Sequence, residues 1–575
     1  MFDMSCIKNI LTICCLALSF QFISSNAHGT EKKIPPIKQD NLILGERIYR
    51  EGILPSGKSM FGYIKGDLQA PGTSFACISC HMQSGLGSFE GNVLTTPTNG
   101  ASLYRPRAPF SGLRSGGMSM ERNKLPPPPQ TPPRPAYTDE SLADALRGGV
   151  DPSGRVFDPV MPRYNFQDSD MAILVSYLKN LSSEFSPGVD ATTLRFATII
   201  TDDLPPERYG AHLALLDDFI KKTNERTDYI ENQVKNPRIK RQLMNSGRVA
   251  YRKLSLSRWL LKGAPETWRS QLEEYYRKEP VFALLGGMSG TVWKPVHDFC
   301  EAKRLPSLFP QTDFPVISDT DWYTLYISKG YYLEGETAAR FLNRSDAFPE
   351  HGKVLQVARE SNEGKMLADG FKVTWREFGR TPPVTVLLAG KEVLTAERLA
   401  VLVAREKPDA VVIWDNASLL TALNAMPATN VKLPRNIIIS STYIGKASAE
   451  LSEQVRNITF LTYPERFPSE EKQLEAYYFG TKPENSKQGT DISESVKRTY
   501  PLTRLLSQLL PEMREQFYSD YLLDLIGMVN DLDVPLYERM SFCPGQRYAS
   551  KGCYVVQLGK GSKPDLIKKS DWVIH

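Results

Sequence analysis

Two cysteines and a histidine stand close together in the segment FACISCHMQSGLGSFEG, as Cys77, Cys80 and His81. Residues of these types at this spacing suit a pair of zinc ligands, a redox-active dithiol or the covalent attachment of haem. A structural zinc site needs four ligands, and the other histidines are scattered singly. A redox dithiol normally follows a strand, whereas these flanks are rich in glycine and serine. The C-x-x-C-H spacing therefore favours haem, with two thioethers and one axial imidazole.

A second axial ligand is expected downstream of the histidine. Met161 stands before Pro162 in an irregular stretch rich in proline, glycine and aspartate, and such a loop can bring a thioether over a flat ring. A helix is predicted from about Asp168, where apolar residues repeat at helical spacing. Met161 could equally be a core methionine. Three other methionines are rival ligands: Met82, Met118 and Met120.

Residues 1–27 have the pattern of a secretory signal peptide. Lys8 precedes a mostly apolar run, and small residues at Ser25 and Ala27 frame a cleavage site. The run is shorter than a membrane span, and no later segment is long and apolar enough to span. We therefore expect export to the periplasm and no transmembrane span in the mature chain. Export also suits the haem prediction, because haem of the c type is attached outside the cytoplasm.

Residues from about 40 to 182 resemble a class I cytochrome c domain. The likeness is carried by Gly45 and Tyr49, by the C-x-x-C-H motif, and by the sequence MPRY before a helix. It implies an all-α domain at residues 28–186 that holds one covalently bound haem c. The implied haem-binding residues are Cys77 and Cys80 as thioethers, His81 and Met161 as axial ligands, and Pro97, whose carbonyl orients the imidazole. An insertion at residues 105–137, rich in proline, departs from small cytochromes, and its role as a surface wrap or a partner-docking segment is open.

After a predicted linker at residues 187–193, residues 194–575 have a different pattern. Short apolar runs such as RFATIIT, KVLQVAR and DAVVIWD alternate with amphipathic helices. This alternation predicts parallel sheets covered by helices, and the length is enough for two lobes. The segments EPVFALLGGMSGTVWKPVHDFCEAKRLP and GKVLQVARESNEGKMLADGF resemble the type I periplasmic binding fold, as in amino-acid-binding components of ABC transporters. We therefore expect an all-α cytochrome domain followed by a two-lobed α/β domain.

That resemblance places ligands in the cleft between the lobes, on loops at the carboxyl ends of strands. The matching positions are Ser289, Gly290 and Thr291 after one strand, and Asp415 and Asn416 after another. Free amides at helix N-termini would favour an anionic group such as a carboxylate. The same residue types also form turns and caps in any βα loop, so both roles are open.

The remaining cysteines predict one disulfide, and the absent motifs and the charge pattern limit the classes of ligand that the chain could bind. Cys543 and Cys553 close a short loop, which in an oxidising compartment predicts a disulfide, while Cys300 is expected to be buried in a helix. No phosphate-binding glycine motif and no G-x-S-x-G elbow are present. The net charge of +5 is dispersed, which gives no support to nucleic-acid binding.

The main functional hypothesis is a periplasmic electron-transfer protein with one haem, because axial His and Met ligands leave no open position on the iron. The second domain would then sense a small molecule or dock a redox partner protein. One alternative is a solute-binding protein for an amino acid or carboxylate, with an accessory haem. The other is a haem enzyme, which requires that Met161 is not a ligand. Electron carriage is favoured over catalysis, and the donor, acceptor and solute are open.

Overall fold

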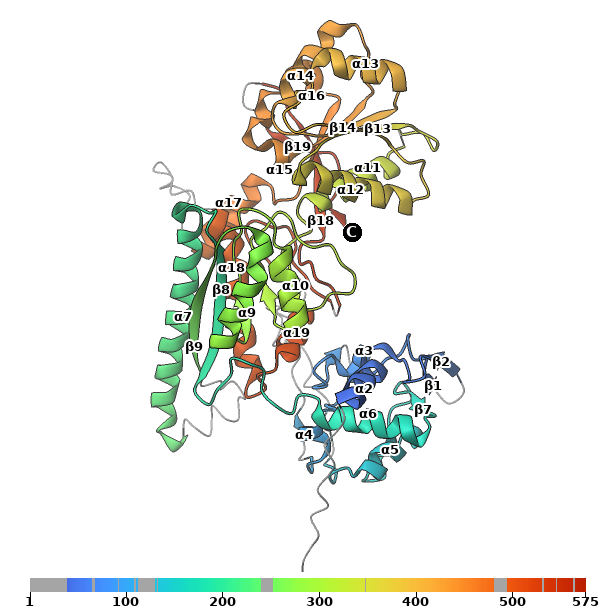
Figure 1. The fold of residues 1–575 in the computed structure, drawn as a ribbon, viewed down its shortest axis with the longest axis vertical. Coiled ribbons are helices and arrows are strands. Elements are labelled where there is room, and N and C mark those ends of the chain that lie inside the picture. Colours follow the sequence, from blue (N-terminus) through green and yellow to red (C-terminus); the bar gives the residue numbers. More distant parts are fainter. Residues whose placement is uncertain are drawn as a thin grey trace, which may run out of the picture.

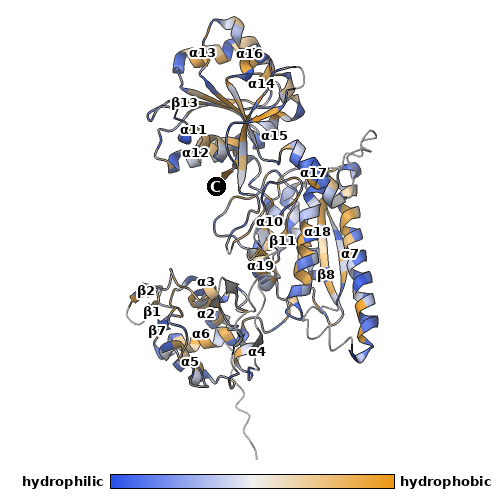
Figure 2. Ribbon diagram, turned by 180° about the vertical axis from the view of Figure 1, so that it is seen from behind, coloured by the Kyte–Doolittle hydropathy of each residue, from blue (hydrophilic) through white to orange (hydrophobic). Residues whose placement is uncertain are grey.

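The computed structural model describes residues 39–64, 68–90, 93–107, 110–111, 130–131, 133–238, 252–346, 348–479, 494–529, 532–543, 545–561 and 564–574. The predicted signal peptide and most of the proline-rich insertion lie outside these residues. The described chain forms an N-terminal domain and two α/β lobes, and the first lobe lies between the other two bodies (Figure 1). The view from behind shows the same order (Figure 2).

The N-terminal domain has five helices and a small sheet among its described residues. The helices are α2 (Gln39–Glu51), α3 (Ile78–His81), α4 (Gly100–Leu103), α5 (Asp139–Gly148) and α6 (Asp168–Asn180). The antiparallel sheet has the order β2-β1-β7, formed by β2 (Leu68–Pro71), β1 (Phe61–Ile64) and β7 (Arg163–Tyr164). Two further strand pairs are β3 (Phe89–Glu90) with β4 (Val93–Leu94), and β5 (Phe110–Ser111) with β6 (Gln130–Thr131).

The predicted all-α fold of this domain is therefore wrong. Alternate residues of β1 are exposed and buried, which is the period-2 pattern of a half-buried strand. The strand pairs with β7, which directly follows the predicted ligand Met161. The sheet thus holds the Met161 loop in place.

Helices α2 and α6 cross in close contact and form the centre of this domain. A Cβ atom on Gly45 would lie 2.5 Å from Cβ of Tyr177 and 2.9 Å from the carbonyl oxygen of Ile173, so only glycine fits there. The ring of Tyr49 lies 5.5 Å from that of Tyr177, centroid to centroid. Gly45 and Tyr49 therefore set the distance between the two helices, as the sequence pattern indicates.

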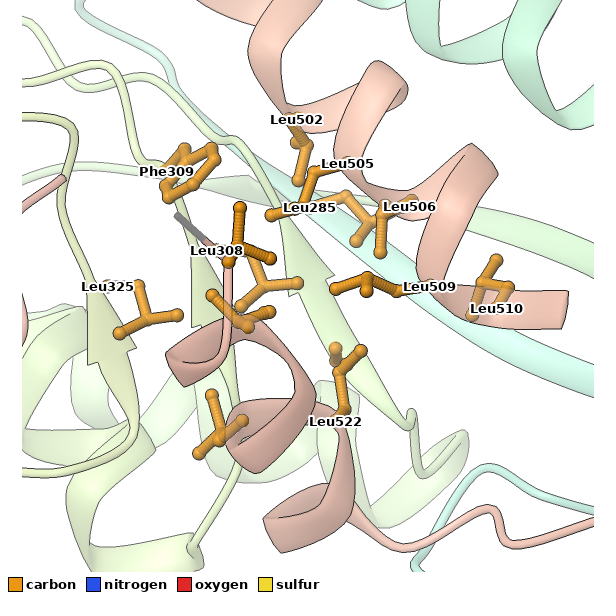
Figure 3. Packing of buried hydrophobic residues seen from close by; sticks show 14 of the residues in the cluster. Leu285, Leu308, Phe309, Leu325, Leu502, Leu505, Leu506, Leu509, Leu510 and Leu522 are labelled. Carbon is orange, nitrogen blue, oxygen red and sulfur yellow. The ribbon is translucent and has the colours of Figure 1, made fainter. Parts of the chain in front are cut away.

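The first lobe is a parallel five-stranded sheet with the order β12-β11-β10-β8-β9. Its strands are β8 (Thr193–Thr201), β9 (Lys253–Leu261), β10 (Ala283–Leu285), β11 (Ser307–Leu308) and β12 (Thr324–Leu325). Its helices are α7 (Pro206–Val234), α9 (Trp268–Lys278), α10 (Lys294–Lys303), α18 (Glu494–Met513) and α19 (Ser519–Gly527). Figure 3 shows leucines of α18 and α19 packed against leucines of β10, β11 and β12. Residues between Leu285 and Leu325 thus share one core with residues between Leu502 and Leu522, although the two segments are far apart in the sequence.

The second lobe contains an eight-stranded sheet with a parallel part and an antiparallel edge. The parallel strands are β14 (Val384–Leu388), β13 (Val354–Arg359), β15 (Ala410–Trp414), β16 (Asn436–Ser440) and β17 (Thr459–Tyr463). The antiparallel strands are β18 (Gly552–Leu558), β19 (Leu566–Lys568) and β20 (Val573–Ile574). The helices include α11 (Tyr331–Arg344), α12 (Asn362–Glu377), α13 (Ala396–Glu406), α14 (Leu419–Ala425), α15 (Ser441–Ile444) and α16 (Glu453–Arg456). Strands β13, β15 and β16 are buried along their whole length, as parallel strands covered on both faces should be.

The described chain crosses between the lobes at residues 326–330, 464–467 and 541–551. The first crossing leads from β12 into α11, the second from β17 towards α17 (Pro468–Phe479) and α18, and the third from α19 into β18. Tyr326 and Tyr548 pair in parallel, so the first and third crossings lie side by side. The predicted two-lobed α/β architecture is confirmed. No helix in the described ranges is long and apolar enough to cross a membrane.

Candidate functional site

The histidine of the C-x-x-C-H motif has two differently placed ring nitrogens. His81 ends the short helix α3 and is 8% exposed. Its Nδ1 lies 2.9 Å from the carbonyl oxygen of Thr96, whereas its Nε2 is buried without a hydrogen-bond partner among the described residues. Burial lowers the pKa of His81 to about 4, so the ring is neutral at neutral pH. A neutral imidazole that is oriented at one nitrogen and bare at the other is suited to bind a metal.

The carbonyl that orients this imidazole belongs to Thr96, so the prediction of Pro97 is wrong by one residue. Backbone hydrogen bonds decide the register: Thr98 N donates to Gly85 O at 2.7 Å, and Gly87 N donates to His81 O at 3.2 Å. These bonds align the segment of Thr96 with the turn that follows the histidine. The adjacent Pro97 could not reveal such a register in the sequence.

One predicted thioether residue, Cys77, and the predicted distal ligand, Met161, lie at one core. Cys77 and Met161 are partly buried and pack against the same hydrophobic cluster of the N-terminal domain, while Cys80 is exposed. Tyr164 Oη in β7 donates to the carbonyl oxygen of Phe75 at 3.1 Å, which joins the Met161 loop to the segment before Cys77. Burial is the main cause that raises the pKa of Tyr164, and the nearby Cys77 raises this pKa further. This set of groups fits a covalently held haem: two thiols, one thioether and one buried imidazole nitrogen without a hydrogen-bond partner among the described residues.

The predicted ligand residues of the first lobe already have partners within the lobe. Ser289 Oγ accepts from Thr291 N at 3.1 Å and donates to Val292 O at 3.3 Å, which forms a turn. Gly290 N donates to Thr201 Oγ1 and to the carboxylate of Asp203, both at 3.3 Å. The Asp203 carboxylate beside this amide disfavours the anionic ligand group that the sequence pattern suggested.

The predicted ligand residues of the second lobe also have structural partners. Asp415 is 1% exposed and forms a two-point ion pair with Arg359, whose guanidinium also donates to Gly390 O and Glu392 O. Asn416 Oδ1 accepts from Ser418 N at 2.9 Å at the start of α14. These contacts are the turn and ion-pair roles of Asp and Asn. Ligand contact by residues 289–291, 415 and 416 stays a prediction.

Three aromatic rings that the sequence analysis did not single out connect the two lobes. Phe314 follows β11 of the first lobe, and its ring centroid lies 5.6 Å from that of Tyr331, the first residue of α11. The Tyr331 ring lies 5.9 Å from Tyr443 of α15, whose hydroxyl is 2.8 Å from Ser361 Oγ. We call Phe314, Tyr331 and Tyr443 the aromatic bridge. The sequence held a signal for one member, because Tyr443 lies three residues after the end of the strand NIIIS.

Ionisable groups accumulate near the aromatic bridge. Glu334, in the first turn of α11, is 1% exposed and accepts a hydrogen bond from Thr462 Oγ1 at 2.6 Å. Burial raises the pKa of Glu334 and of Glu465 to about 7. Asp313 accepts from Arg498 at 2.8 Å. The junction of the lobes therefore combines rings, carboxyl groups and one guanidinium.

Outside the C-x-x-C-H motif, the described residues include three free thiols, Cys300, Cys543 and Cys553. Cys543 is exposed, whereas Cys553 is buried inside β18, where burial raises its pKa. Both are free thiols, so the predicted disulfide between them is not present in the structure. Cys300 is buried in α10, as predicted.

No protein-family model matches the chain, and no curated protein is similar to it. Several solved structures are similar. A fatty acid ABC transporter substrate-binding protein from Thermomonospora curvata shares 14% identity with a TM-score of 0.41, over 68% of this chain and 95% of that one. A branched chain amino acid ABC transporter from Thermus thermophilus with bound valine shares 13% identity with a TM-score of 0.43, over 68% and 97%. A leucine binding protein from Thermotoga maritima shares 12% identity with a TM-score of 0.41, over 66% and 99%.

Proposed function

We propose that this chain is a periplasmic solute-binding protein that carries a haem c on its N-terminal domain. The observation that supports solute binding is the pair of α/β lobes joined by three crossings. Strands β12 and β17 both lead from their carboxyl ends into a crossing, so the loops after their parallel neighbours lie at the junction of the lobes. Ligands of α/β sheets bind at such carboxyl ends.

The aromatic bridge and its carboxyl groups favour a small amino acid or a related amine as the ligand. Rings of tyrosine and phenylalanine bind an apolar side chain and also attract a cationic amino group. Asp313 adds negative charge at the same junction, and its ion-pair partner Arg498 offers a guanidinium to a ligand carboxylate. These groups come from both lobes, so a bound ligand would hold the lobes together.

A thermal-shift titration of the full-length protein tests solute binding. A true ligand among amino acids, carboxylates and alcohols raises the unfolding midpoint further as its concentration exceeds its dissociation constant. Tyr331→Ala should lose the shift, whereas Tyr229→Ala, at an exposed tyrosine of α7, should keep it. A shift of equal size in both variants would place the ligand elsewhere, and no shift with any compound of these classes would contradict the proposal.

The second part of the proposal is one-electron transfer by the N-terminal domain. Two observations support it: Nε2 of His81 is buried without a hydrogen-bond partner among the described residues, and Cys77 and Met161 pack against one hydrophobic cluster. Haem held by His81 and Met161 would supply one-electron redox chemistry. The residues of this chain would hold the group through Cys77 and Cys80, and Thr96 O would keep the imidazole in the binding orientation.

Extraction with acidic organic solvent tests covalent attachment. The wild-type protein should keep its colour after denaturation and extraction, and Cys77→Ser with Cys80→Ser should release it. Cys543→Ser is the matched control, because this cysteine is exposed and lies outside the motif. Haem that leaves the wild-type chain with the solvent would refute the covalent site.

A further inference from the structure

A buried carboxylate of the first lobe contacts the turn that follows His81. Asp524 of α19 is 4% exposed. Its Oδ2 accepts from Ser84 N at 2.8 Å, and its Oδ1 accepts from Gln83 N at 3.2 Å. The carboxylate and these amides are 440 residues apart in the sequence, so the two domains meet directly at the C-x-x-C-H motif.

This turn is held from two sides. Tyr49 Oη of α2 donates to the carbonyl oxygen of Met82 at 2.8 Å, while Asp524 binds the next two amides from the opposite domain. Met82 has a backbone φ of 63°, a conformation that residues other than glycine rarely adopt. Such a backbone persists only where surrounding contacts enforce it. Asp524 and Tyr49 are contacts of that kind on either side of Met82.

Other contacts bind the same region to the first lobe. Arg50 pairs with Asp520 of α19 at 3.0 Å, and Glu46 pairs with Arg304 at 2.8 Å. Leu86, five residues after the histidine, is buried in the hydrophobic core that contains α18 and α19. The segment that follows the motif is thus part of the first lobe as much as of the N-terminal domain.

We propose that Asp524 is a positioning residue for the haem ligand His81, so that the first lobe completes the haem site. A buried carboxylate is retained at a domain interface only where hydrogen bonds satisfy it, and here both oxygens bind backbone amides next to the ligand. Loss of these two bonds frees the turn and lets the imidazole change its orientation. This inference rests on the proposed haem function.

The test compares Asp524→Asn, Asp524→Ala and Asp520→Asn in the full-length haem protein. Asparagine keeps the volume and one acceptor, so it loses one amide bond, while alanine loses both. Asp520→Asn removes a carboxylate from the same helix, together with its ion pair to Arg50, without touching the turn. It therefore measures the effect of losing a different contact between the two domains. The readouts are the reduction potential and the hydrogen exchange of the amides of Gln83 and Ser84.

We expect exchange of these amides to be about tenfold faster in Asp524→Asn, the factor for one lost hydrogen bond, and faster still in Asp524→Ala. The potential should change more in both variants than in Asp520→Asn, and Asp524→Glu should restore part of the difference. Equal potentials in Asp524→Asn and Asp520→Asn, with unchanged exchange, would overturn the inference. A wild-type chain without covalent haem would instead overturn the proposed function first. If Asp524→Ala does not fold, the comparison of Asp524→Asn with Asp520→Asn is sufficient to test the inference.

Discussion

At the scale of single residues, the proposed haem chemistry of the N-terminal domain depends on Met161. It lies on the loop before β7 and packs against the core that also contacts Cys77. Thioether sulfur stabilises ferrous iron, so Met161→Ala should lower the reduction potential and abolish the weak far-red absorption band of the ferric protein. The variant should also bind cyanide. An unchanged spectrum would transfer the ligand role to another residue.

Glu334 gives a pH dependence that can be measured without any ligand. Burial raises its folded pKa from 4.5 to about 7, so its contribution to stability is present below pH 4.5 and is lost as the pH rises through about 7. The loss is on the order of 3 kcal/mol. Chemical unfolding should therefore show a less stable protein at pH 8 than at pH 5, and Glu334→Gln should flatten this slope. Glu397→Gln, at a carboxyl on the surface of α13, is the control and should leave the slope as in the wild type.

The sequence predicted the haem-motif residues because their types and spacing are themselves the signal. It could not predict Thr96 or Asp524, whose roles depend on a backbone register and on a contact between distant segments. Serine, aspartate and asparagine in βα loops were ambiguous from the start. The structure shows that Ser289 and Asp415 have turn and ion-pair partners, which the sequence pattern allowed equally well.

At the scale of elements, the close contact between α2 and α6 depends on glycine at position 45, which has no side chain. Gly45→Ala places a methyl group 2.5 Å from Tyr177 Cβ and should destabilise the protein by about 1–3 kcal/mol. Gly148→Ala, at the end of α5, meets no atom within 4 Å and serves as the matched control. Denaturant unfolding of both variants measures the difference. A neutral effect of Gly45→Ala would show that the two helices can separate freely.

Elements with strong periodicity were predictable, and short ones were not. Helix α6 begins at Asp168 as its apolar spacing predicts, and the strands of the second lobe match their apolar runs. Strand β7 has two residues and β1 has four, lengths too short for a periodic pattern to be recognised in the sequence. The small sheet of the N-terminal domain was missed for this reason.

At the scale of the whole molecule, the first lobe and the N-terminal domain should not be independent. Expression of residues 194–575 alone removes Leu86 from the core of the first lobe and leaves Asp524 without its amide partners. The fragment should therefore unfold at a lower temperature than the same region in the full-length protein. Asp524→Asn should destabilise the full-length protein but not the fragment, because in the fragment the buried charge has lost its donors. Calorimetry of the four proteins checks this, and additive effects would contradict it.

The position of the N-terminal domain would allow the proposed haem to report changes in its distance from the second lobe. The described contacts of this domain go to the first lobe, while the second lobe lies at the opposite end (Figure 1). Haem absorbs visible light and quenches nearby dyes by energy transfer. A dye attached to the exposed position of Val401 on α13 would therefore brighten or dim as the second lobe moves against the first. Lobe motion could then be followed in real time with a single added label.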